Sequence, residues 1–519
     1  MKSTGLFLLI LILGEWCFGQ NILISNENNP NEPTIIIDPK KPNVILAASN
    51  LNNYFISKDT GRTWSTHRLT SSHGVWGDPV LLVDTAGAFY FFHLSNPPSG
   101  NWIDRIVCQK TTDAGLNWSD GSFTGLNGNK DQDKHWTALD PRNNTIYMTW
   151  TQFDSYSSTN PKDSSIILFS KSIDNGISWS TPKRINTVAG DCLDRDQTVE
   201  GAVPCVGPNG EVYVAWAGPQ GIRFNKSEDA GNTWLPNDLF VDSIPGGWDY
   251  VIPGIYRCNG LPITACDLSD GPNKGTIYIN WTDQRNGIGN TDVWLSKSTD
   301  QGKNWSTPTK VNTDASQKHQ FFTWMTIDQT TGYLYFVFYD RRAYNDQSTD
   351  VYLAVSKDGG KSFINKRISE SPFIPNENIF FGDYNNITVS NGIIRPIWTR
   401  LHNGSLSIWT HLITANELLT ETTQTVLSNS NLEFENFPNP ANYIEFVSFK
   451  LHESKTVDLS IYNSQGIKVV DIISGQKRGY GKYIESIDLN AINLANGIYQ
   501  IRLFLDYKLI SSRDLMIGK

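Results

Sequence analysis

Charged residues and cysteines are scarce in this chain of 519 residues. Only 18% of the residues are Asp, Glu, Lys or Arg, and there are 6 cysteines. The absence of a Cys-x-x-Cys motif and of any histidine cluster argues against a zinc site. The net charge of −9 gives no basic surface for a nucleic-acid partner. Beyond the first residues, no apolar run is long enough to span a bilayer, so we expect no transmembrane segment.

The first 19 residues have the pattern of a secretory signal peptide. Lys2 supplies the positive charge, the run from Leu6 to Leu13 is apolar, and the small residue Gly19 precedes Gln20. We expect cleavage near Gly19-Gln20 and loss of Cys17 with the peptide. The mature protein is then exported and soluble.

The five remaining cysteines would therefore meet an oxidising compartment. The close pairs Cys192–Cys205 and Cys258–Cys266 are candidates for small loop-closing disulfides. Cys108 has no close partner in the sequence, and we expect it to be a buried free thiol.

Glycine and aromatic residues are plentiful, with 41 Gly, 17 Trp and 20 Tyr, which is typical of a turn-rich, all-β chain. The pattern Ser/Thr-x-Asp-x-Gly-x-x-Trp/Phe occurs six times, with its Asp residues 54 to 71 positions apart, so the chain is a repeat architecture. The Asp accepts hydrogen bonds inside a turn, the Gly allows a positive φ, and the aromatic ring packs between units. The copies begin at Ser57, Thr111, Ser172, Ser227, Ser298 and Ser356.

This pattern resembles the Asp box, or bacterial neuraminidase repeat, of sialidase-like β-propellers. Three short strands precede each copy and a fourth follows. A seventh triple at 384–411 has no copy, and residues 21–25 supply its missing strand, which also covers an edge. We therefore predict a propeller in residues 20–412 with seven blades. Sialidases of the family have six, and six blades remain the alternative.

The C-terminal part differs in composition from the propeller. Residues 413–433 are polar and form an expected linker. In residues 434–519, Phe437-Pro-Asn-Pro440, a strand ending at Gly466 and Leu494-Ala-Asn-Gly497-Ile-Tyr follow one another. This order resembles the C-terminal sorting domain of the type IX secretion system of the Bacteroidota; an ordinary accessory β-sandwich is the alternative. The resemblance implies a small β-sandwich, the secretion machinery as a partner, and a product that is secreted or attached to the outer cell surface, often with the tail removed.

A propeller brings together the loops that precede each first strand and those that follow each second strand. These loops carry carboxylates, arginines and aromatic residues, and they lie on the face opposite the repeated turns, so we expect the site there. A sialidase needs three arginines for the substrate carboxylate, a Tyr activated by a Glu, and an Asp that protonates the leaving oxygen. The resemblance implies Asp78, Glu200 and Tyr384 as catalytic residues and Arg285, Arg341 and Arg400 as the arginines. Trp76, Asp133 and Asp383 stand in the same converging loops and are further candidates for substrate binding.

The family's early Arg-Ile-Pro signature is absent, and Arg105-Ile-Val is the nearest string. Whether the chain is an enzyme is therefore left open. The leading hypothesis is a monomeric, exo-acting glycoside hydrolase on sialic or another acidic sugar. The alternative is a non-catalytic propeller that binds a glycan or a protein as an adhesin or scaffold, and a lyase is a third option.

Each candidate residue also has a structural interpretation. Asp283 and Asp340 follow strands, where Asp commonly caps turns, and nearby arginines would pair with them and brace adjacent blades. Asp78, Asp133 and Asp383 around a channel would alternatively hold Ca²⁺, which is the only cofactor that the sequence suggests.

Overall fold

The computed structural model divides into two compact units, Met1–Thr414 and Ala415–Lys519. The expected signal peptide at 1–19 and nearly all of the expected linker at 413–433 lie outside the described residues. No helix in the part that is described is long and apolar enough to cross a membrane. The structure describes residues 21–415, 417–418, 434–451, 453–463, 468–492, 494–506 and 508–518.

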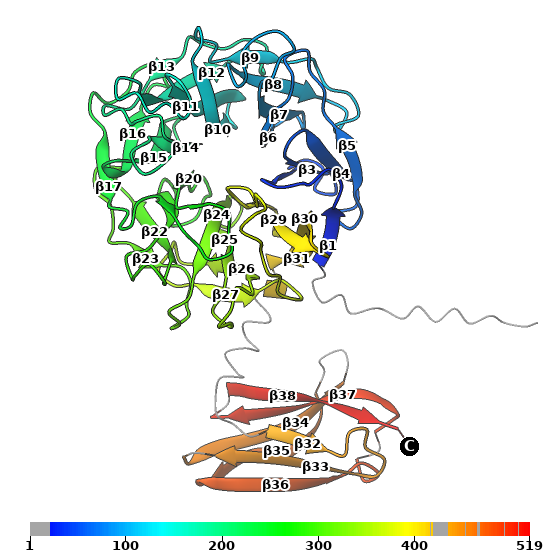
Figure 1. Ribbon diagram of the computed structural model, residues 1–519. Coiled ribbons are helices and arrows are strands. Elements are labelled where there is room, and N and C mark those ends of the chain that lie inside the picture. The colour runs from blue at the N-terminus through cyan, green and yellow to red at the C-terminus, as the bar shows by residue number, and fades with distance from the viewer. Residues whose placement is uncertain are drawn as a thin grey trace, which may run out of the picture. The chain divides into compact units, whose positions relative to one another are not determined.

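The first unit is built from one repeated sheet of four antiparallel strands in sequence order. Each sheet runs from the centre of the ring to its outside, with first strands such as β6 and β10 near the axis (Figure 1). The first sheet contains β2 (Thr34–Ile37), β3 (Ile45–Ser49), β4 (Asn53–Ser57) and β5 (Ser65–Arg68). The second contains β6 (Gly77–Val83), β7 (Phe89–Leu94), β8 (Ile106–Thr111) and β9 (Ser122–Thr124). The third contains β10 (Asp131–Asp140), β11 (Thr145–Phe153), β12 (Ser165–Ser172) and β13 (Lys183–Arg184).

The next three sheets repeat this order. The fourth contains β14 (Glu200–Val206), β15 (Val212–Gly218), β16 (Gly221–Ser227) and β17 (Leu239–Asp242). The fifth contains β20 (Ile263–Cys266), β21 (Ile277–Asp283), β22 (Asp292–Ser298) and β23 (Thr309–Lys310). The sixth contains β24 (Gln320–Asp328), β25 (Tyr333–Asp340), β26 (Asp350–Ser356) and β27 (Ile364–Arg367). A short hairpin of β18 (Asp249–Tyr250) and β19 (Cys258–Asn259) is inserted between the fourth and fifth sheets.

A seventh sheet closes the ring with strands from both ends of the unit. It contains β28 (Asn386–Ser390), β29 (Ile393–His402) and β30 (Ser405–His411), with β31 (Ile413–Thr414) paired to β29. Its outer place is taken by β1 (Asn21–Ser25), which pairs with β30, as the sequence predicts. The sheet topology of residues 21–414 therefore follows the seven-unit arrangement and not the six-unit alternative.

Large aromatic side chains fill the space between the sheets. Trp150, Trp216, Trp281 and Trp398 lie on the second strands of four sheets and are fully buried. Packing of this size between neighbouring sheets removes a large apolar area from water and holds the ring together.

The six repeated turns join third and fourth strands, at the face opposite the starts of the first strands. In one of them, Ser172 Oγ donates to Asp174 Oδ1 over 2.8 Å, and the backbone N–H of Gly176 donates to Ser172 Oγ over 2.9 Å. The aromatic residue at the end packs on the preceding sheet, for example Trp234 against Phe169, with ring centroids 4.9 Å apart. The turns therefore connect two strands of one blade, and their aromatic residues pack on the neighbouring blade.

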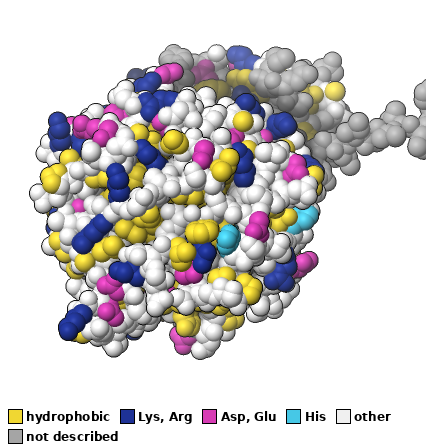
Figure 2. Space-filling model, turned by 90° about the horizontal axis from the view of Figure 1, so that it is seen from above, with side chains coloured by type: hydrophobic (Ala, Val, Ile, Leu, Met, Phe, Trp, Pro, Cys, Tyr) yellow, Lys and Arg dark blue, Asp and Glu magenta, His cyan; other side chains and the backbone are white. Residues whose placement is uncertain are grey.

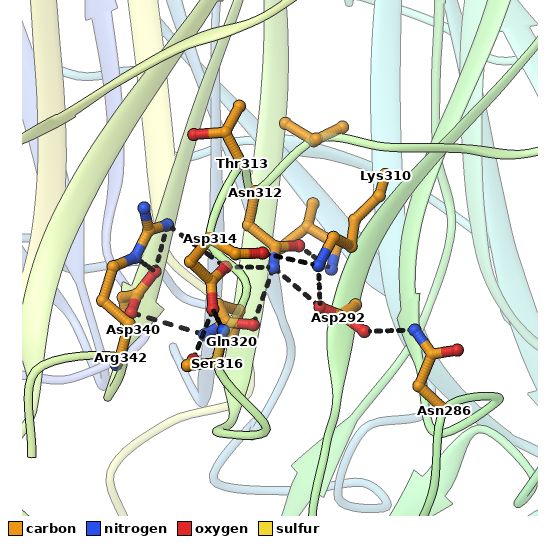
Figure 3. A network of polar contacts seen from close by, with 12 residues as sticks. Asn286, Asp292, Lys310, Asn312, Thr313, Asp314, Ser316, Gln320, Asp340 and Arg342 are labelled. Atoms are coloured by element: carbon orange, nitrogen blue, oxygen red, sulfur yellow. Dashed lines mark hydrogen bonds and ion pairs between the residues drawn. The ribbon is translucent and has the colours of Figure 1, made fainter. Parts of the chain in front are cut away.

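Polar networks join the fifth and sixth sheets (Figure 3). Asn312 Nδ2 lies 2.7 Å from Asp292 Oδ1 and 2.7 Å from Asp314 Oδ1. Arg342 Nη2 lies 2.6 Å from Asp340 Oδ2. This pairing of an arginine with the aspartate that ends a second strand agrees with the structural interpretation of Asp340.

All five cysteines in the described residues are buried free thiols. The expected free Cys108 is confirmed, whereas the disulfide pairs Cys192–Cys205 and Cys258–Cys266 are wrong. Each pair is divided between different elements, because Cys258 belongs to β19 of the inserted hairpin and Cys266 ends β20 of the fifth sheet. Closeness in sequence does not bring these thiols together.

The second unit, described by itself, contains two sheets. One has the order β32-β33-β36 and the other β35-β34-β37-β38. Val447, Leu459 and Ile501 lie in the apolar core of this unit. The strands are β32 (Phe434–Phe437), β33 (Ile444–Leu451), β34 (Lys455–Asn463), β35 (Lys468–Arg478), β36 (Gly481–Asp488), β37 (Gly497–Leu505) and β38 (Lys508–Ile517).

On the face shown in Figure 2, acidic and basic side chains are interspersed, and no large area carries one sign. Apolar side chains form small patches between them. A cluster of ion-paired side chains lies instead inside the channel, where the first strands begin.

Candidate functional site

A recurrent β-bulge at the start of the first strands positions the polar side chains of the channel. The register shifts within β6, β10, β14 and β24. The residue at the bulge has a positive φ in each case, a conformation that only glycine adopts without strain. Glu32, two residues before β2, has the same conformation. These residues are Glu32 (φ 52°), Asp78 (φ 50°), Lys134 (φ 47°), Gly201 (φ 73°) and Phe322 (φ 50°).

Lys134 is a buried cation at the centre of this arrangement. Its Nζ lies 3.2 Å from Asp78 Oδ2 and 2.8 Å from Asp383 Oδ2, and the side chain is 6% exposed. Burial alone lowers the pKa of Lys134, but Asp383 and Asp78 outweigh burial and raise the pKa well above its usual value. Lys134 is therefore charged, and it joins residues of three blades.

Arg257, on the inserted hairpin, is the second cation. Its Nε donates to Asp383 Oδ1 over 2.7 Å and its Nη1 donates to Asp194 Oδ2 over 3.0 Å. Asn259 Nδ2, on the same hairpin, donates to the carbonyl oxygen of Asp383 over 2.9 Å. Arg257 and Lys134 together hold the pKa of Asp383 well below its usual value, although burial opposes this. Asp383 is therefore a carboxylate shared by both cations.

Glu200 and Asp194 form a pair of carboxyl groups beside these cations. Glu200 is 1% exposed, and neither of its carboxyl oxygens accepts a hydrogen bond in the described structure. Burial, followed by the neighbouring charge of Asp194, raises the pKa of Glu200 well above its usual value. Asp194 accepts a hydrogen bond from Tyr156 Oη over 2.7 Å. Burial therefore favours the neutral form of Glu200, beside the carboxyl group of Asp194.

Two more buried acids complete the cluster. Burial raises the pKa of Asp133 to about 7, with the neighbouring charge of Asp78 acting in the same direction. Burial and Asp78 also raise the pKa of Glu32, whose Oε2 accepts a hydrogen bond from Asn50 Nδ2. The same Asn50 accepts from the backbone N–H of Asp78 over 2.7 Å and so fixes the bulge at that residue.

A cavity extends from the acid pair to an aromatic wall. One part is lined by Glu200, Asp194, Asp249, Arg257 and Lys134. The adjoining part shares Lys134, Asn259 and Asp383 and is lined by Trp136, Trp324 and Tyr384. Its volume, counted as the space open to water-sized molecules, is about 30 Å³. The cavity brings apolar ring faces next to a few convergent polar groups.

Tyr384 lies in this aromatic wall, 5.1 Å between ring centroids from Trp136. Its hydroxyl has no hydrogen-bond partner in the described residues. Burial and the charge of Asp78 raise the pKa of Tyr384 well above its usual value, which disfavours the phenolate that a nucleophile requires. Of the predicted catalytic set, Glu200 and Tyr384 therefore line the cavity, in an environment that opposes activation of Tyr384, and Asp78 is not among the lining residues.

A row of aromatic side chains leads from the surface to the acid pair. Trp76 and Trp102 are 37% and 39% exposed and pack edge to face, with centroids 5.7 Å apart. Trp102 packs in the same way on Tyr156, again at 5.7 Å, and Tyr156 bonds to Asp194. Trp76 is thus the outer end of a continuous aromatic surface.

The three predicted arginines are held by separate contacts and do not line the cavity. Arg285 pairs with Asp283 at 2.6 Å and lies 4.6 Å above the Trp294 ring. Arg341 Nη1 donates to the carbonyl oxygen of Pro253 over 2.8 Å, and Arg400 lies 5.3 Å above the Trp409 ring. Burial lowers the pKa of Arg341 to about 10. A clamp formed by these three side chains is not assembled.

The sequence offered Ca²⁺ held by Asp78, Asp133 and Asp383 as an alternative, but the structure places a lysine among these carboxylates. The ammonium group of Lys134 lies between Asp78 and Asp383, where a cation held by both carboxylates would sit. Among the residues described, no group of three or more His, Cys, Asp and Glu side chains is arranged to hold a metal ion.

Sequence reasoning named the acids of this site and missed its cations. Lys134 stands in the polar string from Asp131 to His135, and its positive charge among aspartates was the available signal. Arg257 and Asp194 lie in segments outside the repeated strands, where no spacing marks them.

Comparison with family models identifies the C-terminal unit. Residues 435–515 match the family described as the secretion system C-terminal sorting domain. The match covers the expected tail, and it marks the chain as one that carries a secretion signal at its C-terminal end. A search among curated proteins gave no match.

Three of the solved structures that this chain resembles in fold are named as a polysaccharide lyase and as sialidases. An ulvan lyase of polysaccharide lyase family 25 aligns at 12% identity and a TM-score of 0.48, covering 77% of this chain and 99% of that chain. A Hadza microbial sialidase, Hz136, aligns at 13% identity and a TM-score of 0.41, covering 72% and 74%. The NanB sialidase of Streptococcus pneumoniae aligns at 9% identity and a TM-score of 0.44, covering 72% and 84%. At these values the similarity is one of fold, and the function is argued from the site.

Proposed function

We propose that the propeller is an extracellular glycan-processing protein whose best-supported activity is glycoside hydrolysis. The observation that carries this proposal is Glu200, a buried carboxyl beside Asp194 whose pKa is raised well above its usual value at the edge of a cavity. A carboxylic acid that stays protonated near neutral pH is the group that protonates a glycosidic oxygen. Asp133, with a pKa of about 7, is the second acid–base candidate.

This assignment gives the proton-donor role to Glu200 and not to Asp78. Asp78 forms an ion pair with the ammonium group of Lys134 at 3.2 Å and is not among the residues that line the cavity. It is therefore not placed to deliver a proton to a leaving oxygen in that cavity. In this scheme the ion pairs of Lys134 with Asp78 and Asp383 supply fixed charges beside the cavity.

The aromatic surface at the entrance supports a glycan as the ligand. Sugar rings stack on the faces of Trp and Tyr side chains, and Trp76 and Trp102 present such faces to solvent. The same surface also suits the alternative, in which the propeller binds a glycan without cleaving it. The carboxyl pair distinguishes the two functions, because binding alone does not require a buried acid.

The experiment is hydrolysis of a panel of fluorogenic glycosides, sialoside included, by the full chain and by Glu200→Gln. We expect turnover of at least one member, and a fall in kcat of about 10²- to 10⁴-fold in the variant with KM little changed. Asp270→Asn, which removes an exposed carboxylate paired with Lys274, is the control and should behave as the original protein. Saturable glycan binding with no turnover of any member would favour the binding function instead.

The C-terminal sorting domain supports a location outside the cell. The finer prediction is export by the type IX secretion system of the Bacteroidota, with the product released or attached to the outer surface. The test is fractionation of a cell that carries this system, with and without residues 434–519; the truncated chain is expected to remain in the periplasm.

A further inference from the structure

The charges that line the cavity restrict the kind of glycan it accepts. Two cations, Lys134 and Arg257, face the space, and each is already paired with carboxylates of the protein. Four carboxyl groups face the same space: Asp194, Glu200, Asp249 and Asp383. Within the described structure, the cavity therefore offers no unpaired cation to an anionic ligand.

An acidic sugar would meet unfavourable electrostatics at this position. Its carboxylate would approach the ionised carboxylate of Asp383, and the guanidinium group of Arg257 is already shared by Asp383 and Asp194. The arginines that a carboxylate clamp requires lie elsewhere, since Arg285 is neutralised by Asp283. Like charges close together in a partly dry site are strongly disfavoured.

The same cavity has polar oxygens that lack partners. Both oxygens of the buried Glu200 are without a hydrogen-bond partner in the described residues, and the half-buried Asp249 lines the same space. Burial, followed by Asp196, raises the pKa of Asp249. A buried acceptor without a donor costs free energy, and a ligand that supplies N–H groups or positive charge recovers it.

Building on the proposed function, we propose that the cavity selects a glycan that carries an amino group and no carboxylate. The amine lies at Asp249, beside the neutral Glu200, and the sugar face lies against the wall formed by Trp136 and Trp324. Neutral sugars bind more weakly because they lack the charge, and acidic sugars bind most weakly. This order is the reverse of the one expected for a sialidase.

The test is isothermal titration of the full chain with three oligosaccharides of equal length. One is a glucosamine oligomer, the second its N-acetylated form, and the third a uronic acid oligomer. We expect the amino form to bind at least about tenfold more tightly than the acidic form, which corresponds to about 1.4 kcal/mol. Equal affinity, or preference for the uronic acid oligomer, would overturn the proposal while leaving glycan processing in place. Absence of binding to all three would overturn both.

Because the chain has a net charge of −9, attraction of a cationic oligomer to the whole surface must be separated from binding in the cavity. Asp249→Asn is expected to reduce the ratio of the two affinities to near one, with the melting temperature unchanged. Asp270→Asn removes the same charge from an exposed site and should leave the ratio as it is. A ratio that falls equally in both variants would show general attraction and would contradict the cavity assignment.

Discussion

At the scale of single residues, the site depends on one lysine. Lys134 supplies a positive charge that pairs with Asp78 and Asp383 inside the channel. Its backbone adopts a strained positive φ at a bulge, so the chain is distorted locally to place it there. The lysine thus balances part of the negative charge of the cluster.

Replacement of Lys134 by Met should destabilise the propeller by about 3–5 kcal/mol, because a buried ion pair loses one partner and leaves carboxylates without compensation. The measurement is urea unfolding at neutral pH. Lys226→Met is the matched control: its side chain is also buried, but its partner Glu228 is 66% exposed, so the loss should be much smaller. Equal losses in the two variants would show that Lys134 is not the central charge.

The pKa of Asp133, at about 7, predicts a pH dependence of stability. A carboxyl whose folded-state pKa is raised above its unfolded value of about 3.9 contributes stability that is full below that value. This contribution is lost as the pH rises through about 7. Asp133→Asn should therefore flatten the fall in melting temperature between about pH 4 and about pH 7. A fall of unchanged slope in the variant would contradict the assignment.

At the scale of elements, the repeated turns act as spacers between blades. Gly231 has a φ of 81°, and a Cβ at this position would lie 2.2 Å from Phe169 Cζ of the preceding sheet. The glycine is therefore required twice, once by its backbone conformation and once by the close approach of a ring. The Asp of each turn holds the loop, and the glycine lets the next blade approach.

Gly231→Ala should cost about 1–3 kcal/mol for the steric clash, in addition to about 1 kcal/mol for the positive φ. Gly128→Ala is the control, because it has a φ of 62° with no atom within 4 Å of the added Cβ. The Gly128→Ala variant should lose only the stability that corresponds to the positive φ, about 1 kcal/mol. The comparison is made by chemical unfolding, and similar losses in both variants would rule out the close packing on Phe169.

At the scale of the whole molecule, the ring is closed by a strand from its own beginning. Ile24 of β1 is 5% exposed and packs with Ile397 and Ile408 of the last sheet. Ile24→Ala should therefore destabilise the whole propeller by about 2–5 kcal/mol. Unfolding followed by tryptophan fluorescence is expected to stay a single transition for residues 21–414. A separate early transition of the last sheet would contradict cooperative closure.

The sequence predicted the fold in detail because the repeated turn fixes strand order and the face on which each loop lies. The same reasoning identified Glu200, Asp383 and Tyr384, which line the cavity, and Asp78 and Asp133, which lie in the charge cluster around Lys134. Arg285, Arg341 and Arg400 were placed by their order in the chain, but the direction of each side chain is set by local partners such as Asp283, and order does not encode it. Arg257 lies on an inserted hairpin outside the repeat, so no pattern predicted it.

The central claim is that Glu200 is a neutral carboxyl at neutral pH, held ready to donate a proton. The most direct measurement is the infrared difference spectrum between the full chain and Glu200→Gln at about pH 7. We predict the carbonyl stretch of one protonated carboxylic acid in the full chain, absent from the variant. A difference spectrum that contains only the stretches of an ionised carboxylate would contradict the account.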